Sequence, residues 1–348
     1  MFHVKHPRQA GARLMTMGKW WPQGLVTLPV RMMGVFEGSG AGAQVNPPVM
    51  DYEGSPYRTE FWEGQGREYE DAVERLALQA LLPSSGGRLV EVGAGFGRLA
   101  DLYLGYDQVI LFDYSRTLLQ EAVRRWGHDP RFLFVAGNLY QLPLASGVAD
   151  ALVMVRVMHH LADVPRALAQ IYRVLHRESV AVLEYANKRH LKALLRWLTG
   201  RQRWSPMDPS PVEFVKLNFD FHPAWMWEQF ARARLVPARQ LAVSHFRVPW
   251  LKRWVPARSL ARLDRLLFTV GGRYPLSPSV FVQVRPQGAE APRYAGVQAV
   301  NDLLACPFCG MEGNFVLTQE DRLFCRSCGT GYARRDGIWD FKEPVDSL

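Results

Sequence analysis

The sequence has few cysteines, and all of them lie in one short segment. Its 348 residues contain four, Cys306, Cys309, Cys325 and Cys328. A secreted protein held together by disulfides would distribute its cysteines over the whole fold. This distribution excludes a disulfide-built protein, and we expect a cytoplasmic location.

Long hydrophobic runs are also missing. No stretch approaches the roughly 18 apolar residues that a transmembrane helix needs, so we expect no transmembrane segment. The apolar stretch at 24–36 is broken by Pro29 and Arg31 and is not followed by a clear cleavage site, which argues against a signal peptide. Residues 1–49 are rich in Gly, Met and Pro and show no periodicity, so we expect a disordered N-terminal extension there.

Acidic residues are scarce between Lys188 and Arg273, where 17 lysines and arginines stand against 5 acidic residues. The net charge of the whole chain is +9, so the remainder is slightly acidic. A basic region interleaved with tryptophan can face RNA, anionic lipid or an acidic substrate. We favour the simpler interpretation, a solvated basic face whose tryptophans are anchored in the core.

Hydrophobic periodicity predicts alternating strands and helices from residue 71 onward. Strands are expected at 89–92, 108–112, 132–136, 151–155 and 180–184, and helices at 71–82, 97–104, 118–126 and 164–175. A mixed insertion at 186–239 follows, then strands at 240–248 and 279–284 with a basic helix at 259–269 between them. Such repeated units predict an α/β fold with parallel strands and right-handed crossovers.

A glycine-rich turn stands at the end of the first expected strand, in the segment LVEVGAGFGRLA. Gly93, Gly95 and Gly97 allow positive φ angles and the close approach of a ligand. Asp113 ends the second expected strand, 20 residues after Gly93, where a carboxylate can accept both ribose hydroxyls of an adenosine. The alternative role of Asp113 is the N-cap of the helix that begins near residue 116.

The acidic residue before this turn favours one cofactor over others. The spacing G-x-G-x-G differs from the G-x-G-x-x-G of dinucleotide sites, and the ATP-binding pattern G-x-x-x-x-G-K-[ST] is absent. Glu91 would repel a pyrophosphate but suits the ammonium group of a methionine moiety. S-adenosylmethionine (SAM) therefore fits better than NAD or ATP.

With these motifs, residues from about 52 to 285 resemble class I SAM-dependent methyltransferases. Further similar segments are GNLYQLPL at 137–144, VMHHLAD at 157–163 and RVLHRESVAVLEY at 173–185, and more loosely YRTEFWEG with Tyr57 and Trp62 as a cap over the site. The resemblance implies a Rossmann-like, seven-stranded, mostly parallel sheet with one reversed strand and helices on both faces. It also implies cofactor-binding residues, namely Glu91, Gly93, Ala94, Gly95 and Gly97 around the methionine end, Asp113 and Tyr114 near the ribose, and Asn138 and Leu139 near the adenine. Many relatives have Asp in place of Asn138, whose amide oxygen can still accept a hydrogen bond.

Methyl transfer needs alignment and exclusion of water, and a general base only when the acceptor must lose a proton. His159 and His160, after the fourth expected strand, and Glu184, at the end of the fifth, are the candidate catalytic residues. Local packing is the alternative role for each of them.

Cys306-x-x-Cys309 and Cys325-x-x-Cys328 have the spacing of a tetrahedral zinc site. Four thiolates leave no open position for water, so we expect a structural Zn²⁺, with disulfides or iron as lesser alternatives. The segment 301–341 resembles zinc ribbons attached to or partnered with methyltransferases, including those that act on RNA and on translation factors. The resulting prediction is a methyltransferase domain at 50–286, a linker at 287–298 and a zinc ribbon at 299–343.

The expected function is methyl transfer from SAM to a small-molecule or lipid-like acceptor, because aromatic residues of the insertion could wall a pocket. RNA is the alternative acceptor, favoured by the basic insertion and the ribbon. Cysteine-dependent pyrimidine methylation and the Asn/Asp-Pro-Pro-aromatic adenine motif find no support in the sequence. A protein acceptor, a non-catalytic SAM-binding partner subunit and peripheral membrane contact remain open.

Overall fold

The computed structural model describes residues 47–318 and 321–345. Most of the predicted N-terminal extension, residues 1–46, lies outside this described part. Pro47, Pro48 and Val49 lie within it, and Val49 lines a pocket that Glu91 and Asp113 also line. The folded part therefore begins before residue 50.

The first half of the chain alternates strands with helices, as the periodicity predicts. A single π-helical turn η1 (Arg58–Trp62) precedes α1 (Glu68–Leu81), β1 (Gly86–Val92), η2 (Ala100–Tyr103), β2 (Tyr106–Asp113), α2 (Arg116–Trp126), β3 (Phe132–Ala136), η3 (Leu139–Gln141), β4 (Ala149–Met154), η4 (Met158–His160), α3 (Val164–Val174) and β5 (Leu175–Ala186).

The second half holds the insertion, the end of the main sheet and the C-terminal segment. Its elements are α4 (Leu191–Leu198), β6 (Val212–Val215), β7 (Asn218–Asp220), α5 (Pro223–Arg232), β8 (Leu235–Val243), α6 (Pro249–Trp254), α7 (Ala257–Arg273), β9 (Ser279–Pro286), α8 (Val300–Leu303), β10 (Phe315–Leu317), β11 (Arg322–Cys325), β12 (Gly331–Arg335) and β13 (Ile338–Val345).

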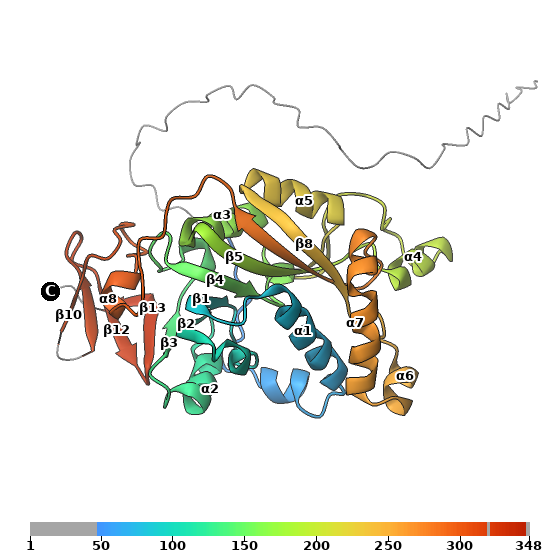
Figure 1. The fold of residues 1–348 in the computed structure, drawn as a ribbon, viewed down its shortest axis with the longest axis horizontal. Coiled ribbons are helices and arrows are strands. Elements are labelled where there is room, and N and C mark those ends of the chain that lie inside the picture. Colours follow the sequence, from blue (N-terminus) through green and yellow to red (C-terminus); the bar gives the residue numbers. More distant parts are fainter. Residues whose placement is uncertain (1–46, 319–320, 346–348) are drawn as a thin grey trace, which may run out of the picture. The chain divides into compact units, whose positions relative to one another are not determined.

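The central sheet has the order β3-β2-β1-β4-β5-β9-β8, and β9 is antiparallel to both of its neighbours (Figure 1). The other pairs among β1 to β5 are parallel. This is the predicted seven-stranded sheet with one reversed strand, so the expected fold class is confirmed. The sheet continues beyond β3, however, because β13 pairs with β3 in parallel and brings β12, β11 and β10 with it, which gives eleven strands in all.

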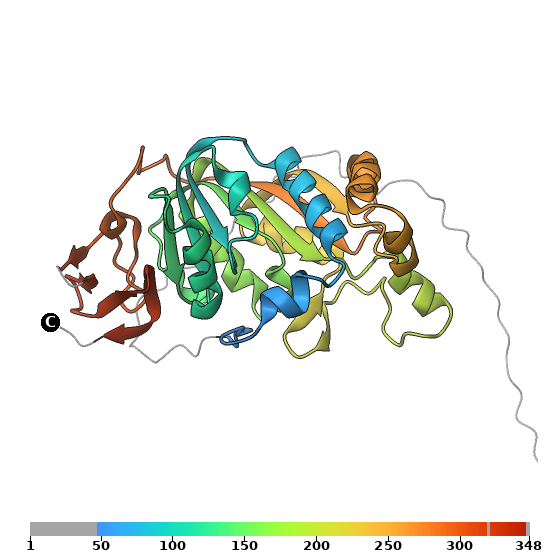
Figure 2. The same ribbon diagram turned by 90° about the horizontal axis from the view of Figure 1, so that it is seen from below.

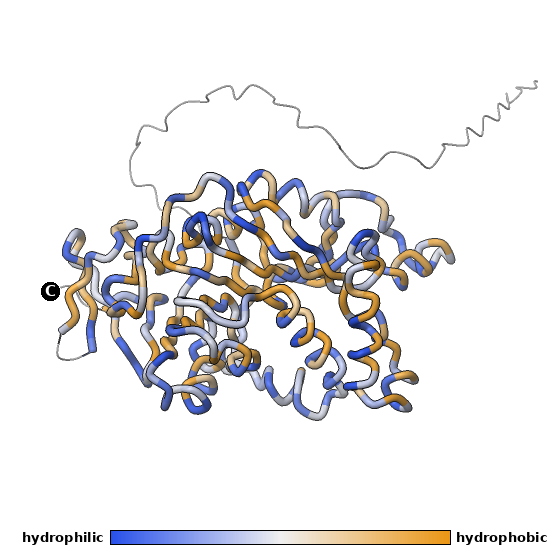
Figure 3. Tube along the Cα trace, viewed as in Figure 1, coloured by the Kyte–Doolittle hydropathy of each residue, from blue (hydrophilic) through white to orange (hydrophobic). Residues whose placement is uncertain are grey.

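Helices cover both faces of the sheet, and each face has its own hydrophobic core (Figures 1 and 2). Strand β1 illustrates the division, since Leu89 packs with α1, α2 and α7 on one face, whereas Val90 and Val92 pack with α3 and α5 on the other. Strands buried on both sides carry continuous apolar runs, which appear as orange stretches in Figure 3. The carboxyl ends of β1, β2, β3 and β4 thereby meet at one edge.

Local sequence explains several helix boundaries. The Ser115 side chain accepts a hydrogen bond from the Leu118 N–H and caps α2, which assigns the capping role to Ser115 and leaves Asp113 free of it. The Asp163 side chain caps α3, whose first turn contains Pro165.

Three predicted elements differ most from the structure. The expected helix at 97–104 is only the short 3₁₀ turn η2, with bonds between residues three apart such as Leu102 N–H to Leu99 O. The strand expected at 240–248 begins at Leu235 and ends at Val243, because Ser244 adopts a φ of 70° and its N–H donates to Asp264. Strand β5 starts at Leu175, well before the expected residue 180, although residues 176–179 are polar.

The tryptophans of the basic region correct another expectation. Trp250 and Trp254 are 67% and 78% exposed, so they do not anchor this region in the core. Among the described residues, no helix combines the length and the apolar character that crossing a membrane would require.

The predicted linker lies against the main domain. The Arg88 guanidinium donates to the Gly296 carbonyl at 2.8 Å, and the Gln108 amide donates to the Gln298 carbonyl at 3.1 Å. On the far side of this segment, Ala145 N–H donates to Leu303 O. The C-terminal end of the predicted linker is therefore hydrogen-bonded to side chains of β1 and β2.

Candidate functional site

The glycine turn after β1 lines a pocket at the carboxyl ends of β1, β2, β3 and β4. Gly93, Gly95 and Gly97 have φ angles of 75°, 54° and 68°, which favour glycine. A Cβ atom on Gly93 would lie 2.0 Å from a methyl carbon of Val157, whereas one on Gly95 would meet nothing closer than 3.9 Å. The turn is thus compact at Gly93 and open at Gly95, where the backbone lines the pocket.

The second predicted site residue, Asp113, holds this turn against the end of β2. One carboxylate oxygen accepts the Gly95 N–H at 2.7 Å, and the other accepts the Ser115 N–H at 2.8 Å. Burial raises the pKa of Asp113, although these N–H groups act in the opposite direction. Each carboxylate oxygen keeps further lone pairs, so Asp113 can still accept ribose hydroxyls.

Glu91, two residues before the turn, is a buried carboxylate at the same pocket. Its Oε2 atom is shielded from solvent and makes no hydrogen bond of ordinary geometry. Burial raises the pKa of Glu91 to about 8, and the neighbouring Tyr103 hydroxyl acts in the opposite direction. A cationic ligand group in the pocket would favour the charged form of this carboxylate.

Asn138 and Leu139, which follow β3, line the same pocket, as do Tyr114 and Ala94. The Asn138 amide oxygen caps the short turn η3 by accepting the Tyr140 N–H at 2.9 Å. The structure therefore brings eight of the nine predicted cofactor residues into the lining of one pocket, and Gly97 is the exception. The Gly97 N–H instead donates to Ala94 O and supports the turn from below.

The other wall of the pocket comes from segments that are distant in the sequence. Tyr52, Tyr57 and Trp62, from the N-terminal cap, contribute aromatic rings, and Tyr57 stacks on Phe61. The loosely predicted cap with Tyr57 and Trp62 is therefore part of the pocket lining. Tyr52 was not singled out from the sequence, because an isolated tyrosine in an irregular segment carries no pattern.

Arg156 is a pocket residue that sequence reasoning missed. It follows β4 with a φ of 60°, and its guanidinium lies 4.9 Å from the Trp62 ring. Its Nε donates to Glu74 at 2.8 Å, while Arg98 donates to the other oxygen of the same carboxylate at 2.7 Å. Burial would raise the pKa of Glu74, but the two arginines outweigh burial and lower it. A buried ion triad thus stands behind this wall.

The two candidate histidines occupy different positions. His160 lines the pocket, with the Tyr52 hydroxyl 2.9 Å from its Nε2 and the Leu217 carbonyl 2.9 Å from its Nδ1. Because a carbonyl only accepts, Nδ1 carries the proton, and Nε2 accepts from Tyr52. Burial lowers the pKa of His160, so the ring is neutral near pH 7, and burial raises the pKa of Tyr52 to about 12.

His159 lies beside His160, with 4.0 Å between the centroids of the tilted rings, but does not belong to the pocket lining. Burial holds the pKa of His159 well below its ordinary value. Glu184 is buried outside the pocket lining. Its carboxylate oxygens accept hydrogen bonds from the Arg156 backbone N–H at 2.9 Å and from the Ser279 hydroxyl at 2.6 Å. Both residues therefore have a structural environment, and only His160 faces the cavity.

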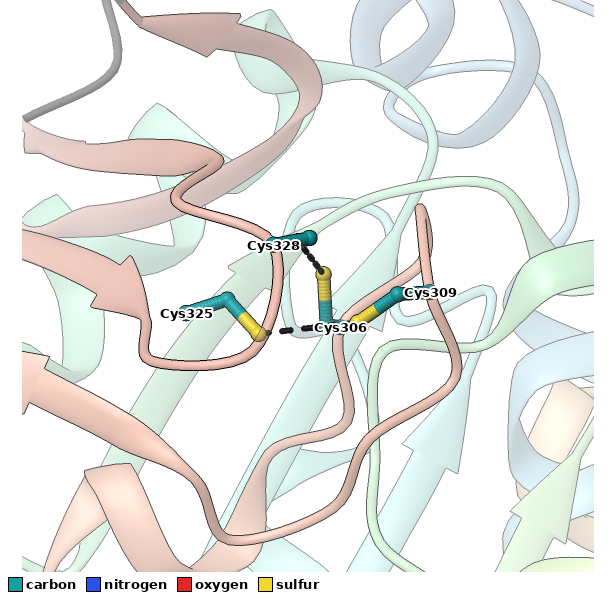
Figure 4. Close-up of side chains that lie close together, drawn as sticks. All are labelled: Cys306, Cys309, Cys325 and Cys328. Carbon is teal, nitrogen blue, oxygen red and sulfur yellow. Dashed lines mark hydrogen bonds between the residues drawn. The ribbon is translucent and has the colours of Figure 1, made fainter.

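The four cysteines meet in one cluster (Figure 4). Their sulfur atoms lie within 4.8 Å of one another, with 3.7 Å between Cys306 and Cys328 and 3.6 Å between Cys309 and Cys325. None is in a disulfide. Four thiolates at 2.3 Å from a central zinc would stand about 3.8 Å apart, which these distances match.

The C-terminal strand β13 also reaches the pocket region. Lys342 of β13 places its ammonium 4.0 Å from the centroid of the Tyr114 ring, and Arg116 of α2 forms an ion pair with Asp340 at 2.8 Å. No pattern in the sequence relates residue 342 to residue 114, because their proximity depends on the pairing of β13 with β3.

Comparisons with known proteins cover part of the chain. Residues 90–183 match a family model described as a methyltransferase domain. An uncharacterized protein in a transposon of Streptomyces fradiae is 33% identical over 108 residues, which are 30% of this chain and 31% of that protein. A probable S-adenosylmethionine-dependent methyltransferase of Mycolicibacterium smegmatis is 30% identical over 123 residues, which are 35% of this chain and 45% of that protein.

The chain thus spans less than half the length of these two relatives. Among solved structures, a SAM-dependent methyltransferase of Thermotoga maritima, described as a possible histamine N-methyltransferase, is 18% identical with a TM-score of 0.47. The similarity covers 64% of this chain and 91% of the Thermotoga maritima chain. The segment 90–183, which runs from β1 to β5 and supplies most of the pocket, is therefore the part of this chain that matches the methyltransferase domain family.

Proposed function

We propose that this protein is a SAM-dependent methyltransferase. The observation that carries the proposal is the convergence of Glu91, the glycine turn and Asp113 on one pocket at the carboxyl ends of β1 and β2. In open α/β sheets, ligands bind in this position. The match of residues 90–183 to the methyltransferase domain supports the same activity.

The residues fit SAM at each end. The Glu91 carboxylate suits the ammonium group, the open backbone at Gly95 admits the chain of the ligand, and Asp113 can accept the ribose hydroxyls. Asn138 and Leu139 complete the adenine side. We call this set, with Tyr114, the cofactor half of the pocket.

The wall formed by Tyr52, Tyr57, Trp62, Arg156 and His160 is the acceptor half in this proposal. Bound SAM supplies an electrophilic methyl group, so the protein has to align the acceptor and exclude water. Aromatic rings on this wall favour a small or lipid-like acceptor with an apolar body.

When the acceptor must lose a proton, the Tyr52–His160 pair can receive it. The neutral His160 Nε2 accepts the hydrogen bond of Tyr52, so a proton given to the Tyr52 oxygen can be matched by transfer of the Tyr52 proton to Nε2. SAM held by the cofactor half would supply the methyl group to the acceptor atom, and its sulfur would keep the electron pair of the broken sulfur–carbon bond. His159 and Glu184 support this wall from outside.

We also propose that Cys306, Cys309, Cys325 and Cys328 hold a structural Zn²⁺. The sulfur spacing fits a tetrahedral ion, and four thiolates close its coordination. The metal would then stabilise the ribbon whose strand β13 pairs with β3.

Calorimetric titration of the full chain with SAM and with S-adenosylhomocysteine tests the proposal. Asp113→Ala should weaken SAM binding at least about 100-fold, because two charge-assisted hydrogen bonds are lost. The matched control is Asp107→Ala, which removes an exposed acid from the same strand. Equal binding by both variants, or no binding by the folded wild type, would refute the cofactor assignment. Binding without any consumption of SAM across an acceptor screen would instead favour a non-catalytic partner subunit.

A further inference from the structure

Exposed apolar side chains gather on one part of the described unit. Of 22 large hydrophobic residues exposed in the described chain, twelve belong to α4, α6, α7 or the loop 274–276. In both ribbon views these three helices lie at the same end of the unit, and the hydropathy colouring alternates between orange and blue along them (Figures 1–3). We call the outer side of these elements the α4–α6–α7 surface.

Helix α7 shows the pattern most clearly. Its buried face includes Leu260 and Phe268. Leu263, Leu266 and Val270 stand at i, i+3 and i+7 on a different face and are 50–76% exposed, and Leu267, which is 38% exposed, borders the buried face. A second apolar stripe on a helix that already buries one face has no partner within the described protein.

On one side of α7, exposed arginines lie between the two apolar faces. At 100° per residue, Arg258, Arg262 and Arg265 fall between the buried face and the exposed stripe. A stripe of cations next to a stripe of leucines is the arrangement of helices that lie in a membrane interface, with apolar side chains among the acyl chains and cations at the headgroups.

Helix α4 repeats the arrangement on a shorter scale. Leu191, Leu195 and Leu198 stand at i, i+4 and i+7 and are 53–71% exposed, with Lys192 beside them. The N–H of Leu191 donates to the Leu276 carbonyl, so α4 continues the surface from the end of α7.

Helix α6 adds two tryptophans. Trp250 and Trp254 are 67% and 78% exposed and flank the basic pair Lys252–Arg253. Tryptophan is the side chain that prefers the boundary between headgroups and acyl chains.

The exposed charge of these elements has one sign, although the Lys252 ammonium is paired with the buried Glu70 carboxylate of α1 at 2.9 Å. Between residues 249 and 276 the only acid is Asp264, which is buried and accepts hydrogen bonds from Tyr69 and Ser244. No acid occurs from 189 to 203 either. The charge of this surface is therefore complementary to an anionic partner.

From these observations we infer that the α4–α6–α7 surface binds the face of an anionic lipid bilayer. Protruding leucine and valine side chains decide against RNA, whose recognition uses cations, hydrogen bonds and stacking and gives no role to aliphatic stripes. The arginines that border each stripe decide against a second copy of this chain, because like charges would meet at the symmetric interface. The inference stands independently of the proposed methyltransferase activity.

Vesicle co-sedimentation of the full chain tests the inference. Binding is expected to phosphatidylcholine vesicles that contain about a third of phosphatidylglycerol and not to pure phosphatidylcholine, and added salt should weaken it. The pair Leu266→Ser with Val270→Ser and the pair Arg262→Glu with Arg265→Glu should each reduce binding at least about tenfold.

Matched controls lie at exposed positions elsewhere. Val297→Ser with Leu317→Ser removes two apolar side chains, and Arg177→Glu with Arg285→Glu reverses two charges, and neither pair should change vesicle binding. Thermal unfolding and SAM titration of every variant verify that the fold and the pocket are intact. Equal binding to both vesicle types, equal loss in the controls, or no vesicle binding by the folded wild type would overturn the inference. In the last case, salt-dependent RNA binding or a dimer broken by the same variants would identify the actual partner.

Discussion

The two halves of the pocket are built in different ways. The cofactor half is made of residues that follow consecutive parallel strands, and its polar contacts are largely backbone N–H groups, such as that of Gly95 to Asp113. The acceptor half joins the N-terminal cap, the segment after β4 and the β6–β7 hairpin through contacts such as that of His160 to Leu217. A half made from strand ends leaves a pattern in the sequence. Of the half assembled from distant segments, Tyr57, Trp62 and His160 were recognisable through the family resemblance, whereas Tyr52 and Arg156 were not. Four predictions sharpen this contrast, in the order of their expected effect on SAM affinity.

Gly93→Ala should have the largest effect. The new Cβ would combine a positive φ angle with a 2.0 Å approach to Val157, so the turn has to move. We expect SAM affinity to fall at least about 100-fold and the unfolding free energy to fall by more than the roughly 1–2 kcal/mol that the backbone angle alone costs. Gly147→Ala is the control, since Gly147 has a φ of 68° but only a 3.7 Å contact. Similar losses in both variants would assign the effect to backbone strain and not to the pocket.

Removal of the metal should have the next largest effect. Cys325→Ser, or chelation of the wild type, should lower the melting temperature and weaken SAM binding about tenfold, because β13 supports β3 and Lys342 contacts Tyr114. Elemental analysis should find one zinc per chain in the wild type. Lys342→Met separates the two contributions, since it should weaken SAM binding slightly and leave both the zinc content and the melting temperature unchanged. A metal-free wild type with an unaltered melting temperature would contradict the structural role.

Glu91→Gln should change stability and affinity in opposite directions. The pKa of Glu91 is raised to about 8, so its protonated form favours folding, and this stability is lost as the pH rises from about 4.5 through 8. The amide avoids that cost, and the ligand-free variant should be more stable than the wild type at pH 8 by about 1–3 kcal/mol. SAM affinity should fall about tenfold, because the amide has no charge for the ammonium group. Denaturation at pH 5 and pH 8 with parallel titrations checks both, and a variant less stable at pH 8 would contradict the assigned environment.

Tyr52→Phe should leave SAM affinity within about twofold of the wild type, because Tyr52 lies in the acceptor half. With an acceptor that must lose a proton, methyl transfer should fall about tenfold and its pH profile should shift, since His160 loses its hydroxyl partner. Thr59→Ala, which alters an exposed hydroxyl of the same cap, is the control. A tenfold loss of SAM affinity in Tyr52→Phe would contradict the assignment of Tyr52 to the acceptor half.

Sequence patterns predicted the fold class and the elements from β1 to β5, because continuous apolar runs and glycine turns follow from local chemistry. The seven-stranded core was predicted from the resemblance and is confirmed, while the eleven-stranded sheet was not foreseen. The pairing of β13 with β3 depends on two edges more than 200 residues apart, and no periodicity of either strand encodes it. For the same reason, the position of Lys342 beside Tyr114 could not be anticipated.

The residues of the candidate site likewise fall into two groups, those that the sequence identifies and those that only tertiary packing brings to the site. Glu91, the glycines, Asp113 and the four cysteines are recognisable because fixed spacing along the chain places them on one turn or one knuckle. Arg156, Tyr52 and the Leu217 carbonyl contribute through long-range packing, and the burial that shifts the pKa values of Glu91 and His160 exists only in the folded chain.

The exposure of the basic region was likewise decided by tertiary structure. The sequence determined that its helices are amphipathic and positively charged. Only packing decided which apolar side chains of α7 are buried and which face outward, because each such helix has more apolar faces than the core can cover.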